Sequence, residues 1–166
     1  MFNPGDYVVY GYSGVCKVEE ITAKEVPGTK EMRDYYALQP IQSAMSRVFT
    51  PVDGKHALRA VMTKEEAERF LNEIEGLEPL EIISDKHREN QYKDVMRTCD
   101  YREWVKLIKT LYIRKAERAK KGKQATAIDN RYARSAEEYL FTELSIALSK
   151  DIEEVELFVT GILEKI

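Results

Sequence analysis

The hydrophobic pattern changes its period near residue 62, and this change constrains the fold more than any other feature of the chain. Before it, short β-branched and aromatic runs with period-two alternation predict strands. The predicted strands cover residues 6–10, 15–20, 35–38, 47–52 and, as a short fifth, 58–62. The Pro–Gly turn at residues 26–30 reverses the chain between two of them. This half is therefore predicted to form a small, barrel-like antiparallel sheet.

After residue 62, apolar residues recur at helical spacing. Thr63 and Glu66 have the spacing of a capping box, and Gly76 ends the first apolar run. The predicted helices cover residues 63–76, 85–98, 101–120, 126–148 and 151–164, with 77–84 as a connector. The sequence thus predicts an α+β protein with two domains: a β domain over 1–62 and an all-α domain over 63–166.

The charge is distributed unevenly, although the whole chain has a net charge of only −3. Residues 86–134 carry 15 basic and 6 acidic side chains, a net of +9, between two segments (63–85 and 135–166) of −6 each. Its densest run contains Arg114, Lys115, Arg118, Lys120, Lys121 and Lys123. Such clusters release counterions from a phosphate backbone, which favours a nucleic-acid interface. The alternative is a solvated helix end, where cations complement the helix dipole.

The helix predicted over 101–120 separates an apolar stripe from its basic residues. The stripe consists of Tyr101, Trp104, Val105, Ile108, Leu111 and Tyr112. Trp104 could act as a wedge between DNA bases, but its apolar neighbours favour a core position. The basic residues Arg102, Lys106, Lys109 and Lys120 fall mostly off the stripe and are predicted to face a partner.

Signatures of catalysis and metal binding are missing from the sequence. It contains neither a glycine-rich phosphate loop nor a histidine placed as a base beside a serine or cysteine. Cys16 and Cys99, with His56 and His87, do not have metal-ligand spacing, so both thiols are expected to be reduced and buried. The N-terminus lacks signal-peptide features, and no apolar run is long enough to span a bilayer. We therefore expect a soluble cytoplasmic, nucleoid-associated protein that is not an enzyme and has no cofactor, metal or membrane contact.

The residues also resemble a known family. The matching positions are Phe2, Gly5, Asp6, Val8, Val9, Tyr10, Gly14, Val15, Val18, Glu19, Ile21, Asp34–Tyr36, Leu38, Val48–Val52, Tyr92–Lys93, Tyr139–Leu140 and Glu143–Leu144. They are similar to CarD/CdnL-type bacterial transcription regulators over essentially the whole chain. The opening motif is shared with the polymerase-binding module of the transcription-repair coupling factor. That enzyme continues into helicase domains, which this sequence does not contain, so the stand-alone regulator is favoured.

The resemblance implies a Tudor-like N-terminal domain that binds the RNA polymerase β subunit through a sheet edge. Lys24 matches a basic position that contacts the polymerase. A second basic position of the family is occupied by Phe49 in this chain. Arg47, two residues earlier on the same strand face, is expected to make the polymerase contact of that basic residue. The alternative for Arg47 is an ordinary solvent-facing arginine.

The resemblance further implies that the helical domain contacts promoter DNA at the upstream edge of the open bubble. Many members have a tryptophan wedge where this chain has Arg88. We predict a sequence-independent DNA surface, formed by Arg88, Lys93, Arg114, Lys115 and Arg118, that modulates the stability of the open complex. The protein is expected to be a monomer. Two alternatives remain open from the residues alone: a protein–protein adaptor without DNA binding, and an RNA-binding protein.

Overall fold

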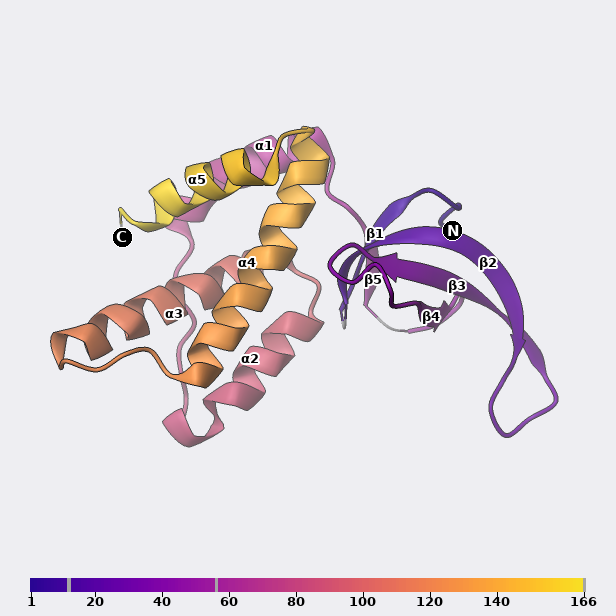
Figure 1. Cartoon of the computed structure of the whole chain (residues 1–166), viewed down its shortest axis with the longest axis horizontal. Helices are drawn as coiled ribbons and strands as arrows, with labels where there is room; N and C mark the ends of the chain where they lie inside the picture. Colours follow the sequence, from indigo (N-terminus) through magenta and orange to yellow (C-terminus); the bar gives the residue numbers. More distant parts are fainter. Residues whose placement is uncertain (12, 56, 166) are drawn as a thin grey trace. The chain divides into compact units, whose positions relative to one another are not determined.

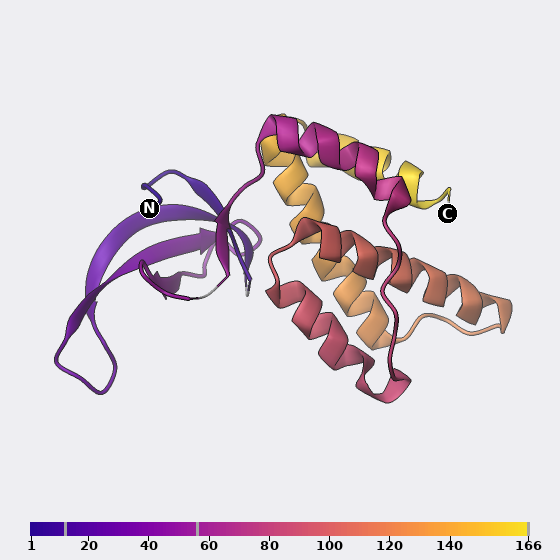
Figure 2. The same ribbon diagram turned by 180° about the vertical axis from the view of Figure 1, so that it is seen from behind.

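The computed structural model of the chain describes residues 1–11, 13–55 and 57–165. It contains two compact units, Met1–Val61 and Met62–Ile166. The first is a five-stranded antiparallel sheet and the second is helical, so the predicted α+β fold is confirmed (Figures 1 and 2).

The sheet of the first unit has the strand order β4-β3-β2-β1-β5, with β4 and β5 at its edges. The strands are β1 (Tyr7–Tyr10), β2 (Gly14–Glu25), β3 (Met32–Pro40), β4 (Val48–Pro51) and β5 (Leu58–Ala60). β2 and β3 are longer than the sequence predicted, because their ladder continues to the pair Glu25–Met32. The two strands are joined by a turn in which Gly28 has a φ of 81°, a conformation that glycine adopts without strain.

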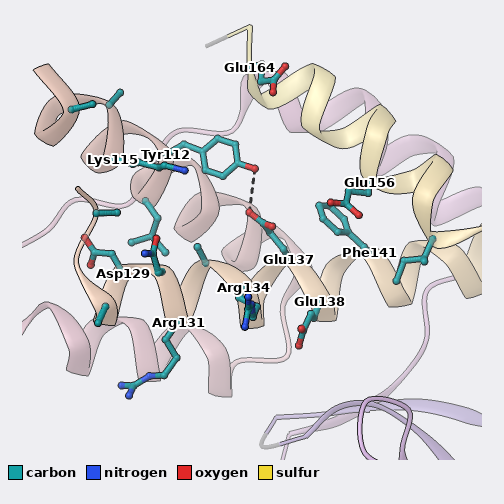
Figure 3. A pocket seen from close by; sticks show the side chains of 18 residues that line it. Tyr112, Lys115, Asp129, Arg131, Arg134, Glu137, Glu138, Phe141, Glu156 and Glu164 are labelled. Carbon is teal, nitrogen blue, oxygen red and sulfur yellow. Dashed lines mark hydrogen bonds between the residues drawn. The ribbon is translucent and has the colours of Figure 1, made fainter. Parts of the chain in front are cut away.

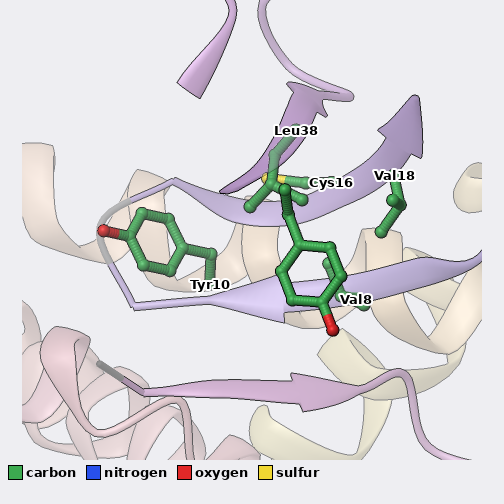
Figure 4. Close-up of a cluster of buried hydrophobic side chains, with 6 residues drawn as sticks. Val8, Tyr10, Cys16, Val18 and Leu38 are labelled. Atoms are coloured by element: carbon green, nitrogen blue, oxygen red, sulfur yellow. The ribbon is translucent and has the colours of Figure 1, made fainter. Parts of the chain in front are cut away.

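Alternate residues of the sheet form its hydrophobic core. The core cluster consists of Val8, Tyr10, Cys16, Val18, Tyr36 and Leu38 (Figure 4). Val48 from β4 and Leu58 from β5 pack against the same cluster, so the two edge strands curl toward a common core. This alternation leaves Ala37 and Phe49 on the opposite face of the sheet.

The second unit contains five α-helices and two 3-10 helices among its described residues. These are α1 (Lys64–Glu73), η1 (Ile74–Gly76), η2 (Asp85–His87), α2 (Arg88–Arg97), α3 (Tyr101–Lys120), α4 (Ala127–Leu148) and α5 (Ile152–Leu163). The predicted capping box is present: the Thr63 side chain accepts from Glu66 N–H, and the Glu66 carboxylate accepts from Thr63 N–H. No helix in the described ranges is both long and apolar enough to cross a membrane.

Trp104 lies in the core of the helical unit, as the apolar stripe predicted. Its relative exposure is 0%, and its ring meets that of Tyr139 edge-on at a centroid distance of 5.6 Å. Cys16 and Cys99 are buried and are not joined in a disulfide, which also confirms the sequence prediction. His56 lies outside the described residues.

Lys109 is placed where the sequence did not predict it. Only 3% of the residue is exposed, so the prediction that it faces a partner is wrong. Its ammonium group donates to the carbonyl of Ile74 and to those of Glu75 and Leu77, at 3.2 and 2.6 Å. These carbonyls belong to the C-terminal turn that ends α1 and η1, where backbone acceptors lack partners within the helix. Lys109 is thus a cap supplied by a different helix.

Candidate functional site

The three residues predicted to bind polymerase lie together on the face of the sheet opposite its core. The Lys24 ammonium stands 3.2 Å from the centroid of the Phe49 ring, and the Arg47 guanidinium lies 5.9 Å from the same centroid. The negative face of an aromatic ring attracts cations. Lys24, Arg47 and Phe49 therefore form one cluster, which we call the Phe49 cluster.

Strand register explains why these residues meet. Phe49 on β4 is opposite Ala37 on β3, which in turn is opposite Glu20 on β2. The alanine side chain between them is short. A long side chain such as that of Arg47 can therefore reach from the β4 side of the sheet to acidic residues on β2.

Two consecutive glutamates on β2 hold Arg47. Its guanidinium lies 3.0 Å from a carboxylate oxygen of Glu19 and 3.1 Å from one of Glu20. Neighbours on a regular strand point to opposite faces, but the β2–β3 register shifts between Val18 and Glu20. This bulge explains how both glutamates reach one partner. Glu19 and Glu20 were not predicted to take part in this cluster, because a register shift leaves no signal in the alternation of apolar and polar residues.

The outer edge of β4 offers backbone groups next to the Phe49 cluster. Val52 N–H donates to the Asp34 carbonyl at 3.0 Å in continuous register with the strand pairs. Because antiparallel ladders alternate, Thr50 bonds inward to β3 while the backbone groups of Phe49 and Pro51 point outward. Pro51 has no N–H, as expected for proline on an edge strand. The N–H of Phe49 is therefore the last backbone donor of β4 that points away from β3.

In the helical unit, the predicted DNA residues Arg88 and Arg114 meet at Asp129. Arg88 Nε lies 3.2 Å from Asp129 Oδ1, and Arg114 Nε lies 2.9 Å from Oδ2. The Tyr92 hydroxyl donates to Oδ1 at 2.9 Å. The Asp129 side chain is only 4% exposed. We call these four residues, which join α2, α3 and α4, the Asp129 cluster.

The pKa directions in the Asp129 cluster follow from burial and from these partners. Burial by itself raises the pKa of Asp129, but the hydrogen bonds from Arg114, Tyr92 and Arg88 outweigh it, so the pKa is lowered. Burial, followed by the bond to the Asp129 carboxylate, raises the pKa of Tyr92 to about 12. The cluster thus holds an aspartate anion between two guanidinium groups.

The remaining predicted DNA residues have other surroundings. Lys93 is 47% exposed and lies 4.0 Å from Glu89. Lys115 is exposed. Arg118 donates its Nε–H to the Gln124 carbonyl at 2.7 Å. The structure therefore brings together Arg88 and Arg114 of the five, whose side chains are only 14% and 21% exposed.

Several further cations of residues 86–134 are more accessible than Arg88 and Arg114. Five of them are exposed and make no ion pair within the described ranges: Lys86 in η2, Lys120 at the end of α3, Lys121 and Lys123 after it, and Arg134 in α4. Lys121 and Lys123 were part of the dense basic run in the sequence. Only the structure separates them from the arginines that have buried partners.

A wide hollow of about 1190 Å³ is lined by residues of α3, α4 and α5 (Figure 3). The Tyr112 hydroxyl points to Glu137 and donates to its Oε1 at 3.1 Å. Burial raises the pKa of Glu137, and the nearby Glu156 raises it further. The described lining contains no histidine, cysteine or serine. No group of three or more potential metal ligands occurs among the described residues.

One family model matches the chain. The model of the CarD-like/TRCF RID domain covers residues 2–62, which include β1 to β5 and the Phe49 cluster. No curated protein matches the chain. The family is defined by an RNA polymerase-interacting module, and the resemblance of the opening residues is confirmed for this part. Residues 2–62 of this chain belong to the CarD-like/TRCF RID domain family.

Proposed function

We propose that this protein is a transcription regulator that binds the RNA polymerase β subunit through its sheet and promoter DNA through its helical unit. The observation that carries the proposal is the family match over residues 2–62, together with the Phe49 cluster, whose aromatic ring belongs to the edge strand β4 of the matched sheet. The protein is proposed to act without catalysis, as a cytoplasmic monomer.

Polymerase binding is proposed to combine strand addition with side-chain contacts. A strand of the β subunit would pair with the outer edge of β4, where Phe49 N–H is available and Pro51 ends the donors. The same approach would bring the partner to Lys24 and to the Phe49 ring. Arg47, held by Glu19 and Glu20, would present its guanidinium in one fixed direction.

DNA binding is proposed to be sequence-independent and driven by phosphate contacts. The supporting observation is the net charge of +9 over residues 86–134. Lys93, Lys115 and Arg118 remain candidates for direct contact, joined by the exposed Lys121 and Lys123. Arg88 and Arg114 would act mainly by fixing the helices on which those cations lie.

Tethering explains how a weak DNA surface would alter initiation. A protein held on polymerase presents its cations to promoter DNA at high effective concentration. Contacts that are stronger in the open complex than in the closed complex would then change the stability of the open complex and the rate of initiation.

The test is co-purification of the full chain with core RNA polymerase. We expect the charge reversal Lys24→Glu to weaken retention at least tenfold, whereas Lys55→Glu, an exposed lysine of the same unit outside the Phe49 cluster, should have little effect. Equal retention of both variants would overturn the proposed interface. In parallel, titrations with duplex DNA and RNA should show that duplex binding depends on salt. Preference for RNA would overturn the DNA part of the proposal.

A further inference from the structure

A groove lies between α1 and α5, since residues of both helices line it. The two helices overlap in Figure 1 and in the reverse view of Figure 2, where they follow a similar direction. The groove has a volume of about 730 Å³. The apolar part of its lining includes Leu71 from α1, Leu148 from the end of α4, and Val155 and Phe158 from α5. The groove lies entirely within the helical unit and contains none of the residues of the Asp129 cluster.

The last helix is apolar on more than one side. Val155 and Val159 are buried against the rest of the unit, as an inward stripe should be. Leu157 and Phe158 are 77% and 57% exposed, and both line the groove. Adjacent exposed apolar side chains at a groove are typical of an interaction surface rather than of scattered surface residues.

The charge around the groove decides between possible partners. From 150 to 164 the chain carries five acidic residues and one basic residue, and from 64 to 76 it carries five acidic and two basic residues. Glu65, Glu66, Glu68, Glu153 and Glu154 are all exposed. Lys64 and Lys150 line the groove beside Glu68 and Glu154, and the excess of negative charge comes from the rest of the two segments, whose net charges are −3 over 64–76 and −4 over 150–164. A second copy of this surface would be repelled, whereas a cationic partner would be attracted.

We propose that the groove between α1 and α5 binds an amphipathic helical segment of a partner protein, with an apolar face toward Leu157 and Phe158 and basic residues on its flanks. α5 has 12 residues and is therefore roughly 18 Å long. It can accompany about three turns of a partner helix, which places the anchors at i, i+3 or i+4, and i+7. The groove contains none of the residues proposed to bind polymerase or DNA, and the inference does not depend on that function.

The apolar contribution is tested with a synthetic amphipathic peptide of about five turns that has leucine on one face and lysine elsewhere, titrated by fluorescence anisotropy against the full chain. The double variant Leu157→Ser/Phe158→Ser should bind it at least tenfold more weakly than the unchanged protein. Ile83→Ser is the matched control, because Ile83 is 86% exposed and lies outside the groove. Thermal melts establish that the variants are folded.

The charge contribution is tested with the same peptide carrying glutamate in place of lysine. The unchanged protein should prefer the lysine peptide, and Glu68→Lys/Glu154→Lys should reduce or reverse this preference. Glu81→Lys, outside the groove, should leave it intact. Equal affinity of the unchanged protein and the Leu157/Phe158 variant would overturn the proposal. So would equal binding of a scrambled lysine peptide, or sedimentation showing self-association that these two substitutions abolish.

Discussion

At the scale of single residues, the helical unit depends on charges that are removed from water. Asp129 would be costly to bury alone, but two guanidinium groups and a phenol compensate it. Lys109 is a buried cation whose partners are backbone carbonyls. In both places a buried charged side chain joins elements that are far apart in sequence, so its removal should affect stability before it affects binding.

Replacement of Asp129 by alanine should destabilise the helical unit by about 3–5 kcal/mol, because Arg88 and Arg114 would lose the buried carboxylate that compensates their charge. The measurement is urea unfolding followed by circular dichroism. Asp94→Ala is the matched control: Asp94 is 77% exposed and 3.9 Å from Arg97, an exposed pair worth about 0–1 kcal/mol. Similar losses for both variants would contradict the structural role of the Asp129 cluster.

The Asp129 cluster also predicts a pH dependence. A carboxylate with a lowered pKa in the folded state contributes stability above its unfolded value of 3.8, and this contribution is lost as the pH falls through the folded pKa. The unchanged protein should therefore lose this contribution only below about pH 4. Asp129→Asn cannot titrate, so its stability should vary less over that range. Parallel pH profiles for the two proteins would contradict the prediction.

Lys109→Met should lower the free energy of unfolding by about 1.5–3 kcal/mol, since it keeps most of the stem but removes a charged donor from three carbonyls. Lys106→Met is the control, because Lys106 is 33% exposed and pairs with Glu103 at the surface. Thermal melts of both variants compare the two environments. A loss at position 106 as large as that at 109 would argue against a cap by Lys109.

At the scale of elements, the helices follow local patterns, whereas the edge of the sheet depends on register. α3 begins after Asp100, whose side chain accepts from Arg102 N–H, and its apolar stripe is buried at Trp104 and Ile108. β4 is short, and Pro51 reduces the number of backbone N–H groups that its outer edge can offer to a partner strand. The bulge in β2 allows both Glu19 and Glu20 to pair with Arg47.

Trp104→Ala should unfold the helical unit at a lower temperature, because a large buried side chain replaced by alanine costs about 3–5 kcal/mol. DNA affinity of the remaining folded protein should change little, since Trp104 is 0% exposed. A thermal melt beside a DNA titration separates the two effects. A variant that melts normally but no longer binds DNA would place the wedge at Trp104 and contradict the core assignment.

At the scale of the whole molecule, the two units are proposed to have separate partners, and substitutions in one should not change binding by the other. Lys121→Ala/Lys123→Ala should lower the salt slope of duplex binding by about one unit per lost phosphate contact and leave polymerase retention unchanged. Arg88→Ala should mainly lower the melting temperature. If Arg88→Ala changes the salt slope without changing stability, Arg88 is a DNA contact after all.

Much of the architecture was predictable from residues close together in the chain. The capping box at Thr63, the burial of Trp104 and the turn at Gly28 follow from patterns that repeat within one helical turn or one strand. The family resemblance also singled out Lys24 and Phe49 as candidates, and the structure places the two side chains in contact.

Which charges remain available to a partner depends on contacts between residues far apart in the chain. Arg88 and Asp129 are 41 residues apart, and Lys109 and Ile74 are 35 apart, so no local pattern pairs them. Glu19 and Glu20 reach Arg47 through a register shift. Hydrophobic periodicity is set within a single element and can be recognised there, whereas the partner of a charged side chain is set by which elements pack together. The spacing of apolar residues was therefore enough to predict a sheet followed by helices, whereas the packing of α2, α3 and α4 places Arg88 and Arg114 against Asp129.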